Sequence, residues 1–156
     1  MLELGSNLEE FNLLNTISGN DFSSSELDEK KPSLVMFICN HCPYVIHYHD
    51  EIKRLTGDYA QILNMVAISS NDIENYPQDG PDKMRELWED LGLSFPYLFD
   101  STQEIAKKYK AECTPEFYLF DHSQQLVYRG RLDESSPNSG IEPTGEDLRD
   151  AIDNLI

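Results

Sequence analysis

Basic residues are scarce in this chain of 156 residues, and long hydrophobic runs are absent. Twelve lysines and arginines stand against 29 aspartates and glutamates, which gives a formal net charge of −17 at pH 7. So negative a surface repels nucleic-acid phosphates and anionic membranes, which argues against both as partners. No apolar run approaches the ~18 residues of a membrane span, and the first residues lack the basic and apolar regions of a signal peptide. We therefore expect a soluble, cytoplasmic protein.

Cysteine is also rare, because the chain has only three, at positions 39, 42 and 113. An odd number excludes a framework in which every cysteine is paired within one chain. In a reducing compartment, spaced thiols are more often catalytic or metal-binding than structural. The cysteines are therefore the first candidates for a functional site.

Length and composition indicate one globular domain over residues 1–156, with 39% hydrophobic and 10% aromatic residues. Dense apolar runs at 33–38 and 62–69 predict buried strands, and Pro43 suits the first turn of the helix between them. We further expect strands at 11–16, 97–99, 116–121 and 125–130, helices at 81–91, 101–110 and 144–156, and a turn with a short helix at 18–31. Ser101 with Glu104, and Thr144 with Asp147, are the expected helix starts. Right-handed crossovers then predict an α/β fold, a central mixed β-sheet flanked by helices on both faces.

Cys39 and Cys42 form a C-x-x-C where the first buried strand ends and a helix begins. The unpaired N–H groups and the dipole of a helix start favour a thiolate over a thiol. His41, directly before Cys42, adds to this effect when it is protonated. The strand–CxxC–helix arrangement therefore predicts a reactive thiolate, and the competing interpretation is two buried thiols that pack as small hydrophobic groups.

A zinc site is the other interpretation of this stretch, with Cys39, Cys42, His47 and His49 as ligands. The two histidines are two positions apart, so on a helix they project from nearly opposite sides. No second C-x-x-C follows in the chain. We therefore expect no metal.

The segment "YKAECTPEFYLF", residues 109–120, resembles the thioredoxin-superfamily segment in which a helix leads into a cis-proline and then a strand. More narrowly, "FICNHCPYV", "ISSND…YPQDGPDKM", "FPYLFD", "CTPEFYLFD" and "LVYRGRLDES" resemble a peroxiredoxin-like branch of the alkyl hydroperoxide reductase C/thiol-specific antioxidant (redoxin) superfamily. The resemblance implies a thioredoxin-like fold with a cis bond between Thr114 and Pro115. It also implies that this loop faces the active-site cysteines and binds the extended substrate backbone, and that the loop 71–83 rims the active site.

The resemblance singles out one cysteine as the nucleophile. Counted from "MFI", Cys42 falls on the nucleophile position of thioredoxin-like proteins, and Val45 on the position of their usual second cysteine. We therefore expect Cys42, beside Pro43, to be the reactive thiolate. Cys113 precedes the cis-proline by two residues, which favours a Cys42–Cys113 disulfide in the oxidised state. A Cys39–Cys42 disulfide is the alternative, and Cys113 as a plain loop residue is a third interpretation.

The resemblance implies a thiol-disulfide oxidoreductase in which Cys42 attacks a substrate disulfide and Cys113 or Cys39 resolves the mixed disulfide. Substrate contacts are expected from Thr114, Pro115, His41 and Pro43. No metal or organic cofactor is needed, and an external reductant regenerates the dithiol. The expected partners are a protein or a small-molecule thiol or disulfide, and the expected state is a monomer or a weak homodimer.

Two departures from thioredoxin bear on the chemistry. Met36 occupies the strand position where thioredoxins keep a buried acid that helps to move protons. His41 can replace that acid as a proton shuttle, because the ordinary pKa of histidine, ~6.5, suits the task. An exposed histidine that caps the helix is an equal alternative.

A peroxidase and a non-catalytic module are the two rival functions. Peroxiredoxins carry P-x-x-x-T/S-x-x-C, but measured back from Cys42 those two positions hold Val35 and Cys39. Measured back from Cys39 they hold Pro32 and Met36, so neither register satisfies the motif. A thiol peroxidase would need a peroxide site built from other residues, and a redox-sensing or binding module would need no turnover.

Overall fold

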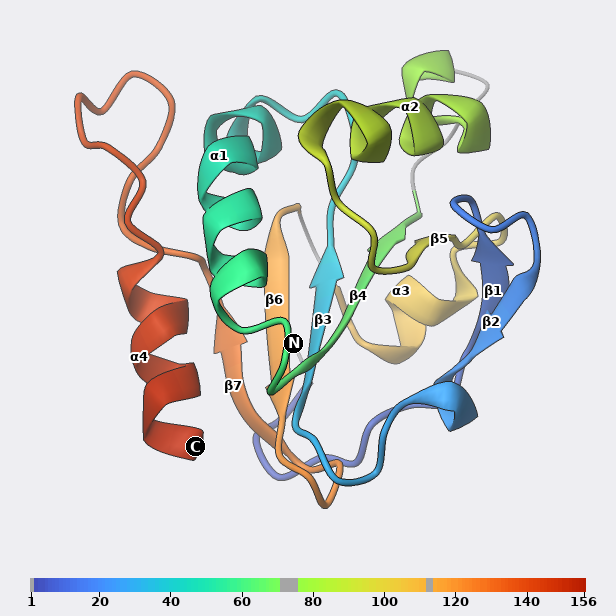
Figure 1. Cartoon of the computed structure of the whole chain (residues 1–156), viewed down its shortest axis with the longest axis vertical. Coiled ribbons are helices and arrows are strands. Elements are labelled where there is room, and N and C mark those ends of the chain that lie inside the picture. Colours follow the sequence, from blue (N-terminus) through green and yellow to red (C-terminus); the bar gives the residue numbers. More distant parts are fainter. Residues whose placement is uncertain (1, 71–75, 112–113) are drawn as a thin grey trace.

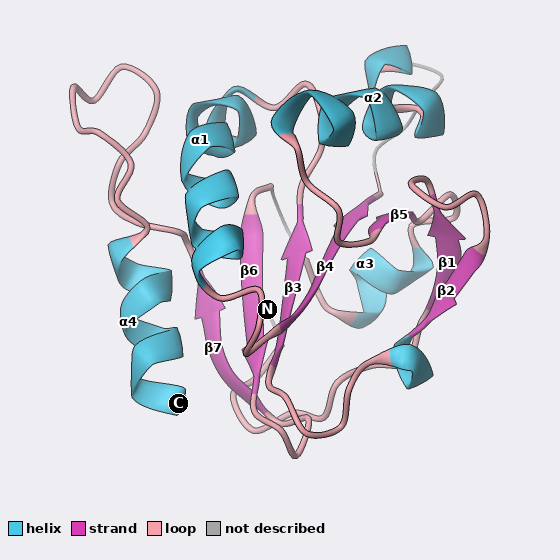
Figure 2. Cartoon of the chain, viewed as in Figure 1, coloured by secondary structure: helices cyan, strands magenta, loops and turns pink. Residues whose placement is uncertain are grey.

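The computed structural model describes residues 2–70, 76–111 and 114–156, which include a seven-stranded sheet with the strand order β2-β1-β5-β4-β3-β6-β7 (Figure 1). The strands are β1 Asn12–Asn15, β2 Asp21–Ser23, β3 Ser33–Phe37, β4 Asn64–Ser69, β5 Tyr97–Phe99, β6 Glu116–Phe120 and β7 Leu126–Gly130. The helices are α1 Pro43–Asp58, α2 Pro81–Leu91, α3 Glu104–Lys108 and α4 Glu146–Leu155, with 3-10 turns η1 Ser24–Glu26 and η2 Pro77–Asp79 (Figure 2). None of the helices in these ranges has the length and apolar character that crossing a membrane requires.

The sheet is mixed, as the sequence predicts. β3 pairs in parallel with β4, and β4 with β5, whereas β6 runs antiparallel to both β3 and β7. All five residues of β3 are buried, because helices or chain segments cover both faces of this central strand. The predicted α/β architecture is therefore confirmed.

Successive side chains of β3 point to opposite faces and divide the core in two. Met36 packs with Trp88 and with residues of α1 and α4 on one face, whereas Phe37 packs with Tyr109 and the N-terminal segment on the other. In Figure 1, α1, α2 and α4 lie in front of the sheet and α3 lies behind it. Helices on both faces are thus confirmed, and the loop after β3 leads toward the start of α1.

Two local predictions are wrong. The segment 18–31 contains the edge strand β2 besides its short helix, and its only ladder is with β1, where Phe22 opposes Leu13. One apolar residue gives no alternating pattern, so the sequence carries no strand signal there.

The predicted helix caps also differ from the structure. Gln103 and Gly145 are the N-cap residues of α3 and α4, and neither helix has a side-chain cap from its N-cap residue. Asp133 instead accepts hydrogen bonds from the backbone N–H groups of Thr144 and Gly145, at 2.8 and 2.7 Å. Asp133, distant in sequence, thus holds the turn before α4, and the predicted Thr144 accepts the N–H of Glu146 on its Oγ1 at 3.3 Å.

A buried carboxylate fastens α4 to α1. Glu51 is 2% exposed, and its Oε1 accepts a hydrogen bond of 2.8 Å from Nε of Arg149. Its Oε2 accepts another of 2.8 Å from Nε of Arg54. The arginine side chains are 56% and 24% exposed, so losing either one leaves the buried carboxylate with a single cationic partner. The start of α4 lies directly against this group, because a Cβ placed on Gly145 would lie 2.6 Å from Oε1 of Glu51.

Gly145→Ala therefore tests how tightly this junction is packed. Gly145 has φ +68°, so any side chain there costs about 1–2 kcal/mol in the left-handed region. Gly140→Ala is the matched control, because Gly140 has φ +76° but no atom within 4 Å of its added Cβ. We expect urea unfolding to show that Gly145→Ala loses at least about 1 kcal/mol more than Gly140→Ala, since it must also displace Glu51 from its arginines. Equal losses would mean that Glu51 moves aside freely.

Candidate functional site

The loop after β3 carries both described cysteines to the start of α1. Cys42 is the N-cap residue of α1, with extended backbone dihedrals, and Pro43 follows at the first helical position. The Cys42 side chain is half-buried, and its Sγ donates to the carbonyl oxygen of Thr114 at 3.5 Å. The thiol therefore lies at a helix start, against the loop that precedes β6.

Cys39 lies deeper in the same place. It is 1% exposed, and its Sγ is 3.5 Å from Oγ1 of Thr114, so both sulfurs contact the same residue. Both cysteines are free thiols. Burial raises the pKa of Cys39, and the nearby charges of Asp79 and Cys42 raise it further, although a hydrogen bond with Thr114 lowers it. Cys39 is thus held as the neutral thiol.

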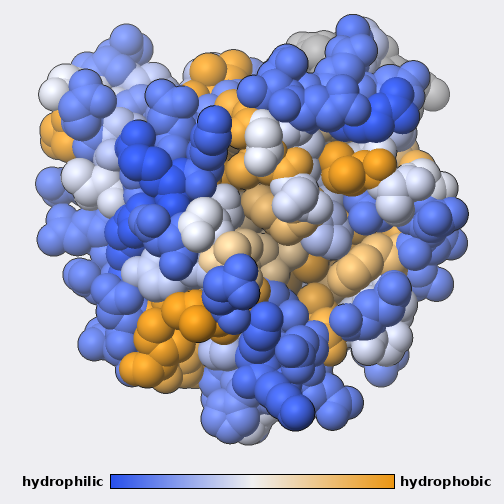
Figure 3. Space-filling view, in the orientation of Figure 1, coloured by the Kyte–Doolittle hydropathy of each residue, from blue (hydrophilic) through white to orange (hydrophobic). Residues whose placement is uncertain are grey.

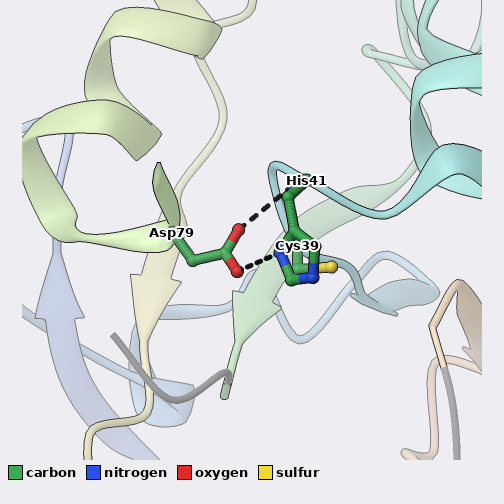
Figure 4. A group of neighbouring side chains, drawn as sticks. All are labelled: Cys39, His41 and Asp79. Carbon is green, nitrogen blue, oxygen red and sulfur yellow. Dashed lines mark hydrogen bonds and ion pairs between the residues drawn. The ribbon is translucent and has the colours of Figure 1, made fainter. Parts of the chain in front are cut away.

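A buried acid from η2 holds the loop between the cysteines. Asp79 is fully buried, and its Oδ1 accepts the backbone N–H groups of Asn40 at 2.7 Å and His41 at 3.1 Å. Its Oδ2 contacts Nδ1 of His41 in a short hydrogen bond (Figure 4). A carboxylate only accepts hydrogen bonds, so Nδ1 carries the proton. Asp79 therefore fixes the loop conformation and the orientation of the imidazole together.

Aromatic side chains support this loop from two sides. Tyr76, which is 45% exposed, stacks on His41 with ring centroids 4.4 Å apart and ring planes at 5°. The buried Tyr97 donates its hydroxyl to Oδ1 of Asn40 at 2.9 Å and stacks on Trp88 at 3.9 Å. Burial keeps the pKa of Tyr97 well above its ordinary value, so its hydroxyl stays a donor.

A pocket of about 390 Å³ opens beside the Thr114–Pro115 peptide bond, which is cis. Its lining comes from three segments, with residues Tyr44, Tyr48, Thr114, Pro115, Arg131, Asp133, Glu134, Ser135 and Ser136. Tyr44 and Ile46, on the first turns of α1, are 49% and 53% exposed. The half-buried thiol is therefore flanked by a pocket and by exposed apolar side chains.

A second hollow, of about 560 Å³, lies elsewhere, lined in part by Gly57, Leu93 and Phe95. Figure 3 shows apolar side chains at the centre of this face, between α1 and the β1–β2 hairpin, within a largely hydrophilic surface. It has no lining residue in common with the pocket beside Pro115. We therefore assign the candidate site to the pocket beside the thiols.

The structure brings together six of the seven residues predicted for the site. Cys39, His41, Cys42 and Pro43 lie between the end of β3 and the start of α1, and Thr114 and Pro115 precede β6 beside them. Cys113 lies outside the described residues. Asp79, Asn40 and Tyr97 were not predicted. The resemblance implies that the loop with "YPQDGP" rims the active site, but it assigns no role to Asp79, which is one acid among turn-forming residues.

Among the described residues, Cys39, His41 and Asp79 have donor atoms within 4.8 Å of one another, a spacing that admits a metal ion. Both oxygens of Asp79 already accept hydrogen bonds from residues 40 and 41, so the geometry fits a hydrogen-bonded array. The histidines of the zinc interpretation point elsewhere. Nε2 of His47 contacts Oγ of Ser135 at 3.0 Å, and Nε2 of His49 is buried with no hydrogen-bond partner.

His49 gives the protein a predictable response to acid. Burial lowers its pKa below the ordinary value of ~6.5, and the charge of Asp50 only partly opposes this shift. Below pH ~6.5 the unfolded state binds a proton that the folded state refuses, so the free energy of unfolding falls as the pH drops. We expect His49→Gln to flatten this decline in urea titrations at pH 7.5 and 5.5. The exposed His122, changed to Gln as a control, should leave the decline intact.

Comparison with known proteins identifies relatives along almost the whole chain. The sequence model of the family described as Redoxin matches residues 3–144. A crystal structure of an uncharacterized conserved protein from Geobacillus kaustophilus is 49% identical, with a TM-score of 0.95, over 99% of this chain and 82% of that one. Thiol-disulfide oxidoreductase YkuV of Bacillus subtilis is 24% identical over 110 residues, 68% of this chain and 70% of the relative.

The fold matches that of a thioredoxin domain of known structure. The thioredoxin domain of a thiol-disulfide oxidoreductase from Bacteroides vulgatus superposes with a TM-score of 0.75, at 15% identity, over 100% of this chain and 99% of that one. At 15% identity, this similarity shows a shared fold and nothing about a shared function. The predicted thioredoxin-like fold is therefore confirmed, independently of any shared chemistry.

Proposed function

Because the chain belongs to the Redoxin family, we propose that it is a thiol-disulfide oxidoreductase whose nucleophile is the thiolate of Cys42. The observation that carries the proposal is the position of this half-buried thiol, at the N-cap of α1 and 3.5 Å from the carbonyl oxygen of Thr114. A helix start favours the thiolate, which is the species that attacks disulfides. The related YkuV bears the name of this activity.

The proposed cycle has two exchanges. Cys42 attacks one sulfur of a substrate disulfide and forms a mixed disulfide, and the other substrate sulfur leaves as a thiolate. Cys39 or Cys113 then attacks Cys42 and releases the second substrate thiol. An external dithiol reductant returns the protein to its reduced state. No metal or organic cofactor takes part in these steps.

We propose that the substrate lies along the pocket beside Pro115. Thr114 and Pro115 line this pocket, and Tyr44 contributes an exposed ring beside Pro43. An extended peptide here would bring its disulfide to Cys42, while apolar side chains of the substrate cover Tyr44 and Ile46. With a net charge of −17, the protein favours substrates and reductants that carry a basic patch. The cytoplasmic location and the monomeric or weakly dimeric state stay predictions.

Reduction of a protein disulfide, such as those of insulin, tests the proposal with dithiothreitol as the terminal reductant. We expect catalytic amounts of the protein to accelerate reduction, with saturation in the disulfide substrate. Peroxide consumption above that of free cysteine, without disulfide turnover, would instead favour a thiol peroxidase. Partner binding that is unchanged in every single-cysteine variant, without either turnover, would favour a binding module.

A further inference from the structure

We propose that Asp79 and His41 form a proton relay that activates the buried Cys39, and that Cys39 is the thiol that resolves the mixed disulfide on Cys42. This inference rests on the proposed function, and it names the resolving cysteine, its general base and the residue that orients that base.

The chemistry of the relay follows from which nitrogen carries the proton. Nδ1–H of His41 donates to Oδ2 of Asp79, so in the neutral imidazole Nε2 carries the lone pair. Figure 4 shows the imidazole between the carboxylate of Asp79 and the sulfur of Cys39, and the donor atoms of the three side chains lie within 4.8 Å of one another. A thiol, an imidazole and an orienting carboxylate in this order are the components of an activated nucleophile.

Cys39 needs a base, whereas Cys42 does not. Cys39 is 1% exposed and has no direct access to hydroxide, and its burial raises its pKa. The charges of Asp79 and Cys42 oppose a negative charge on its sulfur, whereas hydrogen bonds with the side chain of Thr114 and the backbone of Cys42 favour it without outweighing burial. Cys42 is instead the half-buried N-cap residue of α1, and a helix start favours a thiolate. The relay therefore acts on the second exchange of the cycle.

The proposed step is balanced in atoms and electrons. Nε2 of His41 takes the thiol proton of Cys39, and the carboxylate of Asp79 stabilises the resulting imidazolium. The Cys39 thiolate attacks Sγ of Cys42, a Cys39–Cys42 bond forms, and the bond between Cys42 and the substrate sulfur breaks. The substrate thiolate that leaves accepts the proton from His41. The substrate disulfide gains two electrons and the pair of cysteines loses two.

The two sulfurs lie against the same residue. Each lies 3.5 Å from an atom of Thr114, Cys39 from its hydroxyl and Cys42 from its carbonyl oxygen. Asp79 holds the backbone between them through its bonds to the N–H groups of Asn40 and His41, which fixes the loop that carries both sulfurs. Asp79 is therefore a positioning residue, and His41 is the base.

The test separates the two exchanges in a Cys113→Ser protein, reduced and mixed with equimolar 5,5′-dithiobis(2-nitrobenzoate). Attack by Cys42 releases one thionitrobenzoate, and resolution releases the second. We expect His41→Gln and Asp79→Asn to slow the second release about a hundredfold at neutral pH, and to change the first release, which reports the contacts of His41 with the substrate and with Cys42, far less than the second. In Asp79→Asn, the amide oxygen still accepts the loop N–H groups, but the amide NH2 donates to Nδ1 of His41. The ring proton then sits on Nε2, which can no longer accept the proton of Cys39. The deficit should shrink as the pH rises, because a growing fraction of Cys39 is then already ionised before the attack and needs no base.

Asp121→Asn is the matched control, because Asp121 caps the β6–β7 turn through the N–H groups of Ser123 and Gln125. It should leave both releases unchanged. A second release at the parental rate in both His41→Gln and Asp79→Asn would overturn the relay. The relay would also be overturned if the Cys113→Ser parent lost the second release while the native chain retained it. A stoichiometric zinc ion in the purified protein would overturn it as well. A first release that survives Cys42→Ser would contradict the proposed function instead.

Discussion

Replacing Cys42 by serine is expected to lower disulfide turnover by at least about 10³-fold, to the background given by the external reductant alone. Serine keeps the size of the side chain and its hydrogen bond toward Thr114, so the fold is preserved. Its hydroxyl is not ionised near neutral pH, so the helix start has no anion to stabilise. The loss therefore isolates the nucleophile from the structure that holds it.

Cys39→Ser is the informative partner of that variant. It keeps the Cys42 nucleophile, so it should perform the first exchange and then stop as a stable mixed disulfide. Mass spectrometry after reaction with a disulfide peptide would show one covalent adduct at Cys42. Full turnover by Cys42→Ser, or an adduct that maps to another cysteine, would refute the assignment of the nucleophile.

The sequence predicts those parts of the fold that short patterns determine. β3 and α1 follow from a run of buried apolar residues and from a proline at the first helical position, and both begin as expected. The edge strand β2 has no such pattern, because its place depends on pairing with β1. The start of α4 similarly depends on Asp133, which is contributed by another segment of the chain.

The candidate site divides in the same way. Spacing predicts that Cys42 lies at a helix start, and a resemblance links it to Thr114, 72 residues away. Nothing in the sequence connects Asp79 to His41, since they are 38 residues apart and Asp79 lies among turn-forming residues. Position 36 of β3 holds a methionine, and the buried acid that contacts the cysteine loop is Asp79 of η2. Only the folded chain brings Asp79 to that loop.

Trp88→Ala is expected to lower the free energy of unfolding by about 3–5 kcal/mol, a large part of the ~5–15 kcal/mol that keeps a domain folded. Trp88 is 1% exposed and stacks on Tyr97, and its Nε1–H donates to the carbonyl oxygen of Phe95 at 2.9 Å. Alanine removes the ring, leaves a cavity between α2 and the sheet, and leaves that carbonyl without its donor. Urea unfolding followed by far-UV circular dichroism measures the loss, because the variant has no tryptophan left to report by fluorescence.

The consequence for the site follows from the contact between Trp88 and Tyr97. Tyr97 donates to Asn40 inside the cysteine loop, so a cavity behind its ring frees the tyrosine to leave that bond. Tyr97→Phe separates the two effects, because it keeps the stacked ring and removes only the hydroxyl, at a cost of about 1 kcal/mol. If the loop depends on this support, both variants should slow the second thionitrobenzoate release, although only Trp88→Ala loses several kcal/mol. A destabilised Trp88→Ala with an unchanged second release would show that Asp79 alone suffices to hold the loop.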